Sequence, residues 1–342
     1  MATVTTIIDS YGTPGVNCDF TTIDDWALYV SGQSNPDQVG ILRGEHSDPS
    51  INLSAFSGFS VPTTQDACPR LIADPCWQAG YTDYGTAVPF DAPHLYYLTL
   101  LGSFAPGNLR HFKLQGLQAH YLQISFSARG LANVGIWLDS VCVGGLAQIT
   151  GNSSGLETSG TAVRVLCTNC LFIGDNSSAC FYFDAYLSAG SLNVAFLHSV
   201  IAKGAYLYVN GNSNLSVQVI NSVQMAKEDS GLHTTAPALT VAGNASYPPS
   251  EYPDQLSPVF TIQNPEENPG VFANSTYYYS DYRLPAGSPL IDLGVTPSVP
   301  GWDLTGLKDV AGTARPRGSG YDIGLYEYPS LALDSSSLLL CF

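Results

Sequence analysis

The chain has 342 residues, enough for one large domain or two ordinary ones, and it carries 12 Lys and Arg against 28 Asp and Glu. The resulting net charge of −16 argues against a nucleic-acid partner and against an anionic membrane surface, because both require a basic patch. With 33 Gly, 22 Pro and 20 Tyr but only 2 Met, the composition favours short extended segments and turns over helices.

The chain begins with neither a basic start nor a long apolar run, and no stretch approaches the ~20 apolar residues that cross a bilayer. The sequence therefore predicts no signal peptide, synthesis in a cytoplasm and no membrane insertion.

The first predicted element is a short helix over residues 20–30, which Thr21 or Thr22 can cap. Its apolar residues recur on one face: Ile23, Trp26, Ala27 and Val30. Because a solenoid needs its open end covered, we assign residues 1–35 to an N-terminal strand and this capping helix.

A repeat of apolar, polar, small-or-Asn and apolar residues follows in the middle of the chain. Its five copies begin at Leu114, Leu138, Cys167, Leu197 and Ile220. Turn-forming Gly, Asn and Ser clusters separate the copies, and no helical pattern lies between them. A unit of ~20 to 30 residues built from strands and turns is typical of one coil of a parallel β-helix. We predict an all-β, single-domain, right-handed parallel β-helix, with coils and loop insertions over residues 36–270.

Stacking the five copies predicts where their side chains point. The first positions form one inward column, and the fourth positions form the next: Leu117, Val141, Cys170, Val200 and Val223. The third positions mark a tight corner: Gly116, Ser140, Asn169, Ser199 and Ser222. The second positions face solvent: Gln115, Asp139, Thr168, His198 and Asn221.

The eight cysteines establish no disulfide pairing, and we expect free thiols packed as small hydrophobic side chains. Cys167 and Cys170 have the spacing of a zinc-binding pair, but no second Cys-x-x-Cys and no His pair follows them. Both also fall on the inward columns, so we expect them in the core. The sequence predicts no metal ion here and no cofactor.

The most specific motifs lie in the predicted C-terminal closing segment, residues 271–342. They are GSPLIDLG at 287–294, DVAGTAR at 309–315 and YDIGLYEY at 321–328. These motifs, and the start DFTTIDDW at 19–26, resemble those of right-handed parallel β-helix proteins of the pectate-lyase-like superfamily, in particular bacterial and phage members. The resemblance implies the fold and says little about function, because that superfamily includes lyases, hydrolases, adhesins and virion proteins.

Four carboxylates recur in the closing segment: Asp281, Asp292, Asp303 and Asp322. We expect them to accept backbone N–H groups at turns, bridged by Arg315 or Arg317, so that the segment closes the open end of the helix. A calcium site built from the same carboxylates is the alternative. The apolar tail, residues 331–342, is expected to dock on its own domain or on a neighbouring subunit.

An enzyme of this fold needs carboxylates or a basic residue that converge on one outer face. Asp139 and His198 share the predicted solvent-facing column, two coils and ~10 Å apart, which is too far for a direct hydrogen bond. Asp175 and Asp184 are further catalytic candidates whose geometry the sequence leaves open. We therefore favour a protein without enzymatic activity.

Tyrosines are more plentiful than a core demands, and exposed rings stack on sugar faces or anchor protein interfaces. The candidate binding residues are Tyr96, Tyr97, Tyr277, Tyr278 and Tyr279. Strand propensity is the structural alternative for each of them.

These observations lead to one preferred function and two alternatives. The preferred function is a non-enzymatic structural protein of a tailed-phage virion, a head decoration, spike or tail-associated protein that binds host glycans. It predicts capsid or tail proteins as partners, a homo-oligomer such as a trimer, a host surface polysaccharide as ligand, and a location in the virion. The alternatives are a tailspike-type polysaccharide depolymerase, either a lyase or a glycoside hydrolase, and a bacterial surface adhesin.

Overall fold

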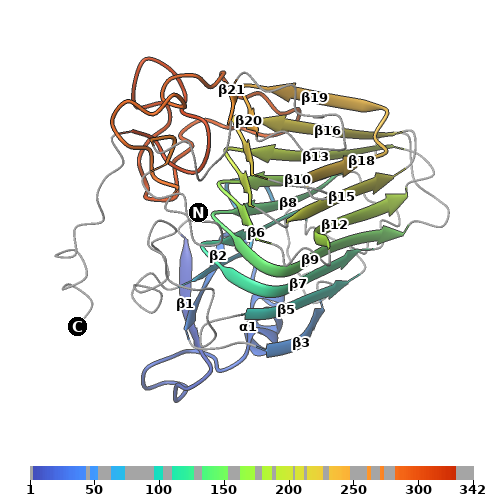
Figure 1. Cartoon of the computed structure of the whole chain (residues 1–342). Helices are drawn as coiled ribbons and strands as arrows, with labels where there is room; N and C mark the ends of the chain where they lie inside the picture. The colour runs from blue at the N-terminus through green and yellow to red at the C-terminus, as the bar shows by residue number, and fades with distance from the viewer. Residues whose placement is uncertain are drawn as a thin grey trace.

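The computed structural model describes residues 3–43, 47–52, 63–73, 96–102, 110–126, 133–152, 162–173, 179–186, 190–202, 205–211, 214–225, 231–246, 260–262, 270–272 and 282–328. In these residues every pairing between named strands is parallel, and the strands stack as successive coils of one solenoid (Figure 1). The predicted all-β parallel β-helix is confirmed.

Each coil has three faces. Face 1 is a nine-stranded sheet made of β1 (Val4–Asp9), β2 (Gln38–Arg43), β4 (Arg70–Ala73), β6 (His111–Gln115), β8 (Asn133–Asp139), β10 (Ala162–Thr168), β13 (Ser191–Leu197), β16 (Leu215–Ile220) and β19 (Ala238–Ala242). Face 2 contains the short strands β11 (Leu171–Phe172), β14 (Val200–Ile201), β17 (Val223–Gln224), β20 (Ala245–Ser246) and β21 (Phe260–Thr261).

Face 3 contains β3 (Ser47–Asn52), β5 (Tyr96–Gly102), β7 (Gln118–Phe126), β9 (Cys142–Asn152), β12 (Ala179–Tyr186), β15 (Tyr206–Gly211) and β18 (Gly231–Thr234). Faces 2 and 3 belong to one sheet, because β9 pairs with β11 at its start and with β12 further along.

The helix that precedes the coils forms as predicted. Helix α1 (Ile23–Ser31) begins after Thr22, whose hydroxyl accepts a hydrogen bond from the Asp25 N–H at 3.1 Å. Its four predicted apolar residues are all buried and belong to the main core of the solenoid. Trp26 lies so close to β2 that a Cβ atom on Gly40 would come within 2.9 Å of its ring. Only glycine allows this approach, which seals the first coil.

The interior columns differ from the prediction by one residue in two coils. Leu114, Leu138 and Cys167 do stack in register, but the column continues with Phe196 and Val219. Leu197 and Ile220, which were predicted there, instead lie on the outer side of face 1 and pack against Val299. The prediction was wrong because it assumed that only the inner side of a strand is apolar.

The same shift applies after the corner. The second inward column runs through Leu117, Val141, Cys170, Ser199 and Ser222, as the hydrogen bonds between neighbouring coils show. Val200 and Val223 lie one position later and contact the outer apolar cluster of face 2. The buried Ser199 and Ser222 are satisfied within the column, since each hydroxyl accepts the backbone N–H of the preceding coil at 3.2 and 3.1 Å.

The corner between faces 1 and 2 is a column of left-handed residues. It consists of Gly116, Ser140, Asn169, His198, Asn221 and Gly243, with φ between 50° and 66°. His198 and Asn221 replace the predicted corner residues Ser199 and Ser222, and both are buried rather than solvent-facing. Asn and His are among the non-glycine residues that tolerate this conformation best, so a corner built from them carries little backbone strain.

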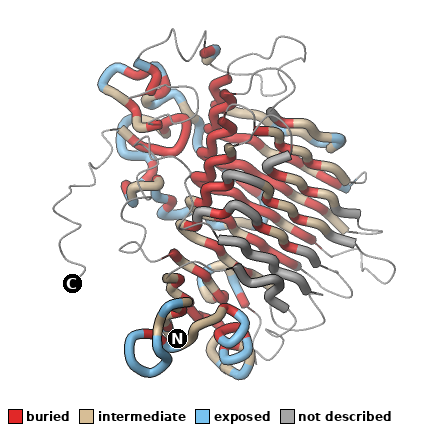
Figure 2. Tube along the Cα trace, turned by 60° about the horizontal axis from the view of Figure 1, so that its bottom comes forward, coloured by how far each residue is buried: buried red, intermediate tan, exposed pale blue. Residues whose placement is uncertain are grey.

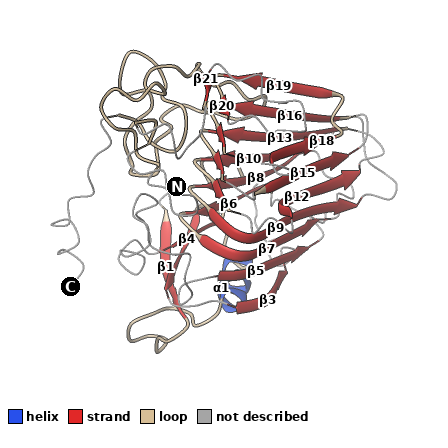
Figure 3. Cartoon of the chain, in the orientation of Figure 1, coloured by secondary structure: helices blue, strands red, loops and turns tan. Residues whose placement is uncertain are grey.

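The described part of the closing segment docks on the side of the solenoid. Its described part, residues 282–328, is called the docked segment below; it is made of loops and turns and lies beside the upper coils (Figures 1 and 3). Leu290, Ile323 and Leu325 pack on the outer side of face 2, while Val299 covers the outer side of face 1. For this part, the expectation that it covers the open end is therefore wrong: the outer sides of the upper coils are apolar and need this cover.

Burial follows this arrangement (Figure 2). A continuous buried column runs along the coils where they turn, and the exposed residues gather in the N-terminal loop and the docked segment. Cys18, Cys68, Cys142, Cys167 and Cys170 are buried free thiols, as predicted for the core cysteines. Within the described residues, no helix has the length and apolarity that a membrane span requires.

Candidate functional site

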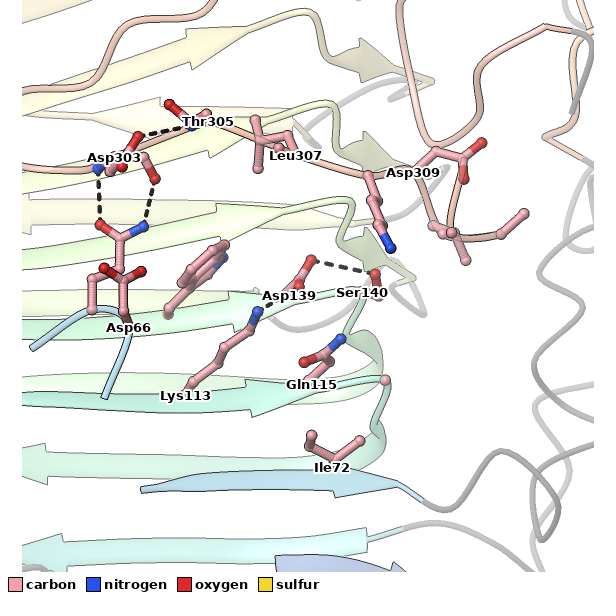
Figure 4. A pocket seen from close by; sticks show the side chains of 18 of the residues that line it. Asp66, Ile72, Lys113, Gln115, Asp139, Ser140, Asp303, Thr305, Leu307 and Asp309 are labelled. Carbon is pink, nitrogen blue, oxygen red and sulfur yellow. Dashed lines mark hydrogen bonds and ion pairs between the residues drawn. The ribbon is translucent and has the colours of Figure 1, made fainter. Parts of the chain in front are cut away.

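A groove of about 470 Å³ opens between the lower coils of face 1 and the docked segment (Figure 4). Strands β4, β6 and β8 supply its floor, with Ile72, Lys113, Gln115, Trp137 and Asp139. Residues 303–312 of the docked segment form the facing wall. Two stretches that lie far apart in the sequence thus enclose one site.

The floor is built by the alternation of side chains along paired strands. In the register of β6 and β8, Lys113 lies beside Trp137 and Gln115 beside Asp139, so all four point to the outer side. The Lys113 Nζ lies 2.8 Å from Asp139 Oδ2 and 3.7 Å from the centroid of the Trp137 ring. The Lys113 and Asp139 side chains are only 12% and 15% exposed, which strengthens their attraction relative to a solvated pair.

Asp139 is held from its other side as well. The Thr168 hydroxyl donates to Asp139 Oδ1 at 2.9 Å, and the Trp137 indole N–H donates to the Thr168 oxygen at 2.8 Å. The carboxylate, the hydroxyl, the indole and the ammonium therefore form one connected network on the groove floor. Such a network fixes the orientation of Trp137 before any ligand arrives.

The wall is tied to the floor by a glutamine. The Gln65 side-chain oxygen accepts a hydrogen bond from the Asp303 backbone N–H, with an N···O distance of 2.8 Å. The Gln65 side-chain nitrogen donates to the Asp303 carbonyl oxygen at 2.5 Å. The Asp303 carboxylate accepts the N–H of Thr305, and this hydrogen bond lowers the pKa of Asp303. Deeper in the wall, Asp309 accepts the N–H groups of Thr313 and Glu327 at 2.7 and 3.0 Å.

Behind the wall lies a buried ion pair. Arg315 and Glu327 have side chains with no exposed surface, and their Nη1 and Oε1 atoms are 2.8 Å apart. Arg315 also donates to Gly324 O and to Asn169 Oδ1, and the Asn169 amide donates to Lys308 O at 2.8 Å. The corner column of the solenoid thus holds the wall of the groove in place.

His198 belongs to this hidden contact and not to the groove. Its Nδ1 lies 3.2 Å from Asp322 O, and its Nε2 lies 3.4 Å from the Asn221 amide nitrogen, which suits a neutral ring with its hydrogen on Nδ1. Burial, and secondarily the charge of Arg315, lowers the pKa of His198 well below its usual value.

The catalytic candidates are consequently dispersed. Asp139 lies in the groove, His198 is covered by the docked segment, and Asp184 lies on face 3, where the Asn210 amide donates to it at 3.2 Å. Asp175 lies outside the described residues. Their catalytic roles stay predictions, but the structure does not bring the three described candidates, Asp139, His198 and Asp184, together at one site.

The closing-segment carboxylates make the turn hydrogen bonds expected of them. Asp292 accepts the Gly320 N–H, which lowers its pKa, and Asp322 accepts the N–H groups of Asp292 and Tyr328. Burial raises the pKa of Asp322 to about 6. The Asp303 carboxylate likewise accepts the Thr305 N–H two residues on, and Asp281 lies outside the described residues.

Arg315 bridges Glu327 rather than these aspartates. In the part of the chain that the structure describes, no three His, Cys, Asp or Glu side chains gather in a way that could hold a metal ion. The calcium site stays a prediction that these residues do not support.

Only some of the predicted binding tyrosines lie among the described residues. Tyr277, Tyr278 and Tyr279 lie outside the described residues, and of Tyr96 and Tyr97 the structure gives the backbone, on β5 of face 3. On the same face, Tyr182 and Tyr208 stack with ring centroids 5.1 Å apart, and Tyr206 stacks on His233 at 4.4 Å. The alternation of Tyr206 and Tyr208 along one strand is the sequence signal that could have identified this row.

Of the other groove residues, Gln115 was predicted to face solvent and Asp303 was a candidate calcium ligand, but neither was assigned to a common site. Lys113 and Trp137 could have been found from the alternation in β6 and β8, because each lies two positions before an outward polar residue. Nothing in the local sequence of residues 303–312 indicates that they face these strands.

The strand pairing defines the class: this chain is a parallel β-helix protein. Among solved structures the chain is similar to the crystal structure of pectate lyase Pel9A, which is 13% identical, with 96% of this chain and 97% of that chain covered and a TM-score of 0.27. No family model and no curated protein matches the sequence, so the closing motif has no support as a family signature. A likeness at this level carries nothing about activity.

Proposed function

We propose that the protein is a non-enzymatic glycan-binding β-helix protein and that the groove between face 1 and the docked segment is its binding site. The proposal retains the location inferred from sequence: the surface of a tailed-phage virion, as a head decoration, spike or tail-associated protein. The groove geometry supports the binding activity, and the virion location depends on the sequence argument alone.

The observation that carries the proposal is that three of the four groove carboxylates, all but Asp66, are already engaged by partners. Asp139 is paired with Lys113 and Thr168, Asp303 accepts the Thr305 N–H, and Asp309 is buried and accepts two backbone N–H groups. A carboxylate engaged in this way holds the shape of a site well. It is poorly placed to transfer a proton or attack a sugar carbon, which requires freedom to change partners.

The remaining lining suits sugar recognition. Sugars present apolar ring faces and many hydroxyl groups, which aromatic rings and side-chain amides or hydroxyls recognise. The groove offers Trp137 together with Gln65, Gln115, Ser140 and Thr305. Its volume also lies within the ~300 to 1,000 Å³ of ordinary ligand sites.

Binding is tested by titrating the purified chain with a panel of soluble oligosaccharides in a calorimeter. We expect at least one class to bind, and we expect Gln115→Ala to weaken that binding at least fivefold. Gln218→Ala is the matched control, because Gln218 lies on the same sheet but away from the groove. Its amide donates instead to the Ser298 carbonyl oxygen of the docked segment. Equal affinities in both variants would place the binding site elsewhere.

The virion location is tested by quantitative mass spectrometry of purified particles. A copy number comparable to the main shell protein supports a head decoration, and a low copy number supports a tail or vertex position. Absence from the particles refutes the virion location. Glycan binding is then decided by the titration alone.

One observation favours a depolymerase as the second candidate: the exposed Asp66 lines the same groove as Asp139. If cleavage occurs, incubation with the bound oligosaccharide yields shorter products, and Asp66→Asn abolishes them without preventing binding. Unchanged oligosaccharide after prolonged incubation supports the non-enzymatic assignment.

A further inference from the structure

The groove carries an unbalanced set of charges. Four aspartates line it, Asp66, Asp139, Asp303 and Asp309, against two lysines, Lys113 and Lys308. Asp303 is ionised throughout the neutral pH range, because the Thr305 N–H lowers its pKa. Asp139 is paired with Lys113 and Asp309 is buried, so the exposed charges are those of Asp66 and Asp303 against Lys308. The site therefore presents a small excess of negative charge on a chain that is itself acidic.

The positive charge of Lys113 is not free to attract an anionic ligand. Its ammonium is 2.8 Å from Asp139 and lies over the Trp137 ring at 3.7 Å, so its charge is already matched by a carboxylate and an aromatic face. A second carboxylate brought by a ligand would have to compete with Asp139 for the same cation. The competition would also release Asp139 as an unpaired, half-buried charge, which is unfavourable.

The carboxylates of Asp66 and Asp303 determine which ligand groups the groove favours. Asp66 is exposed at the end formed by residues 65 and 66, and the Asp303 carboxylate lies along the facing wall (Figure 4). Hydroxyl and ammonium groups donate hydrogen bonds to such carboxylates, whereas a uronic acid at neutral pH offers a negatively charged acceptor there.

On the basis of the proposed function, we infer that the groove selects glycans built from uncharged or amino-bearing sugar units and rejects polyuronates. Amino sugars gain from the excess carboxylates, neutral sugars use the amide, hydroxyl and indole groups alone, and uronates meet repulsion. The ligand class is thus neutral or positively charged, whereas a polyuronate chain is negatively charged.

Three hexasaccharides of one length distinguish these classes: glucosamine hexamer, its fully N-acetylated form and hexagalacturonate. Titrated at low salt, the glucosamine hexamer is expected to bind about tenfold more tightly than the N-acetylated form, and hexagalacturonate is expected not to bind. The preference should shrink at high salt, because ions screen the exposed carboxylates.

Charge variants assign the preference to the groove. Asp66→Asn is expected to reduce the advantage of the glucosamine hexamer at least threefold, and Asp303→Asn should act in the same direction. Asp184→Asn, which makes the same charge change on face 3, should leave the advantage intact. Because the Asp66 side chain is exposed, its variant keeps the test valid even where Asp303→Asn disturbs folding.

The outcomes separate the two proposals. Tight binding of hexagalacturonate, or an equal effect of Asp66→Asn and Asp184→Asn, overturns the inferred selectivity while glycan binding stands. If no oligosaccharide of any class binds, the proposed function fails, and the selectivity fails with it.

Discussion

The outer side of face 1 has two halves that differ although they share one sheet and one register. In the lower coils the outward residues are polar or amphipathic, as with Lys113, Gln115 and Asp139, and they line an open groove. In the upper coils the equivalent positions hold Leu197 and Ile220, which the docked segment covers. The comparison teaches that the inner side of a β-helix sets the fold, while the outer side decides which coils carry a site and which bind the chain's own C-terminal region.

The covered half also supports the open one. Asn169 of the corner column holds residues 303–312 at the groove by donating to Lys308 O, and Asn221 anchors the docked segment further up by binding Val295. The stability of the covered half therefore determines whether the groove has two walls.

The largest effect is expected from breaking the buried ion pair beneath the docked segment. Arg315→Met leaves Glu327 buried without its cation and Asn169 without a donor, so we expect a loss of about 3 to 5 kcal/mol in the free energy of unfolding. Chemical denaturation measures this loss. It should be accompanied by weaker glycan binding, because the groove wall is released.

The double variant Arg315→Met with Glu327→Leu is the control. Replacing both charges by apolar side chains removes the uncompensated carboxylate, so much of the lost stability should return. A loss below about 1 kcal/mol for Arg315→Met alone would show that the pair does not anchor the segment.

The next effect compares the two halves directly at one register position. Gln115, Asp139, Thr168 and Leu197 lie in the same row across face 1. Leu197→Ala empties part of the covered interface and should cost about 3 kcal/mol, whereas Gln115→Ala in the open half should change stability by less than about 0.5 kcal/mol. Equal costs in the two variants, measured by thermal and chemical unfolding, would contradict the distinction between the halves.

The same contrast explains what the sequence could and could not predict. Coils whose outer residues are polar, such as those of Leu114 and Leu138, revealed their register, because apolar character marks the inner side there. At Leu197 and Ile220 both sides of the strand are apolar, so the pattern alone could not choose between adjacent residues. The capping helix was predictable, because its cap and its apolar face are local features.

Only the floor of the groove could be predicted from the sequence. Asp139 was identified as outward-facing, and the structure places it there. The wall depends on tertiary contacts between residues 303–312 and strands far earlier in the chain, and no local propensity encodes such a contact. The burial of His198 has the same origin, since an isolated coil would leave that corner in water.

A pH dependence is expected from His198. Its folded-state pKa lies well below the usual 6.5, so below that pH the unfolded chain binds a proton that the folded chain excludes. Stability is therefore lost as the pH falls below about 6.5, where the unfolded chain takes up the proton. Asp322 acts in the opposite direction between pH 6 and 4, because its folded-state pKa is raised to about 6.

The variant His198→Asn isolates the histidine contribution. Asparagine tolerates the left-handed corner, as Asn169 and Asn221 show in neighbouring coils, and Asp322 stays in place. Unfolding measured at pH 7.5 and pH 5 should show a smaller acid-induced loss in the variant than in the original chain. Identical losses would mean that the ring is not kept neutral by the docked segment.

The smallest effects come from the corner itself, where one substitution should act with opposite sign in the two halves. Ser140 and Asn221 have almost the same φ, 56° and 52°, and glycine adopts that conformation more easily than either. Ser140→Gly, at the open groove, should raise stability by about 0.5 kcal/mol, because relief of ~1 to 2 kcal/mol outweighs the added entropy of the unfolded chain. Asn221→Gly gains the same relief but deprives Val295 N and O of their 2.8 and 2.7 Å partners, for a net loss of about 1 kcal/mol. Stabilisation by both variants in chemical denaturation would show that the corner amides do not hold the docked segment, and opposite signs would locate its anchor at Asn221.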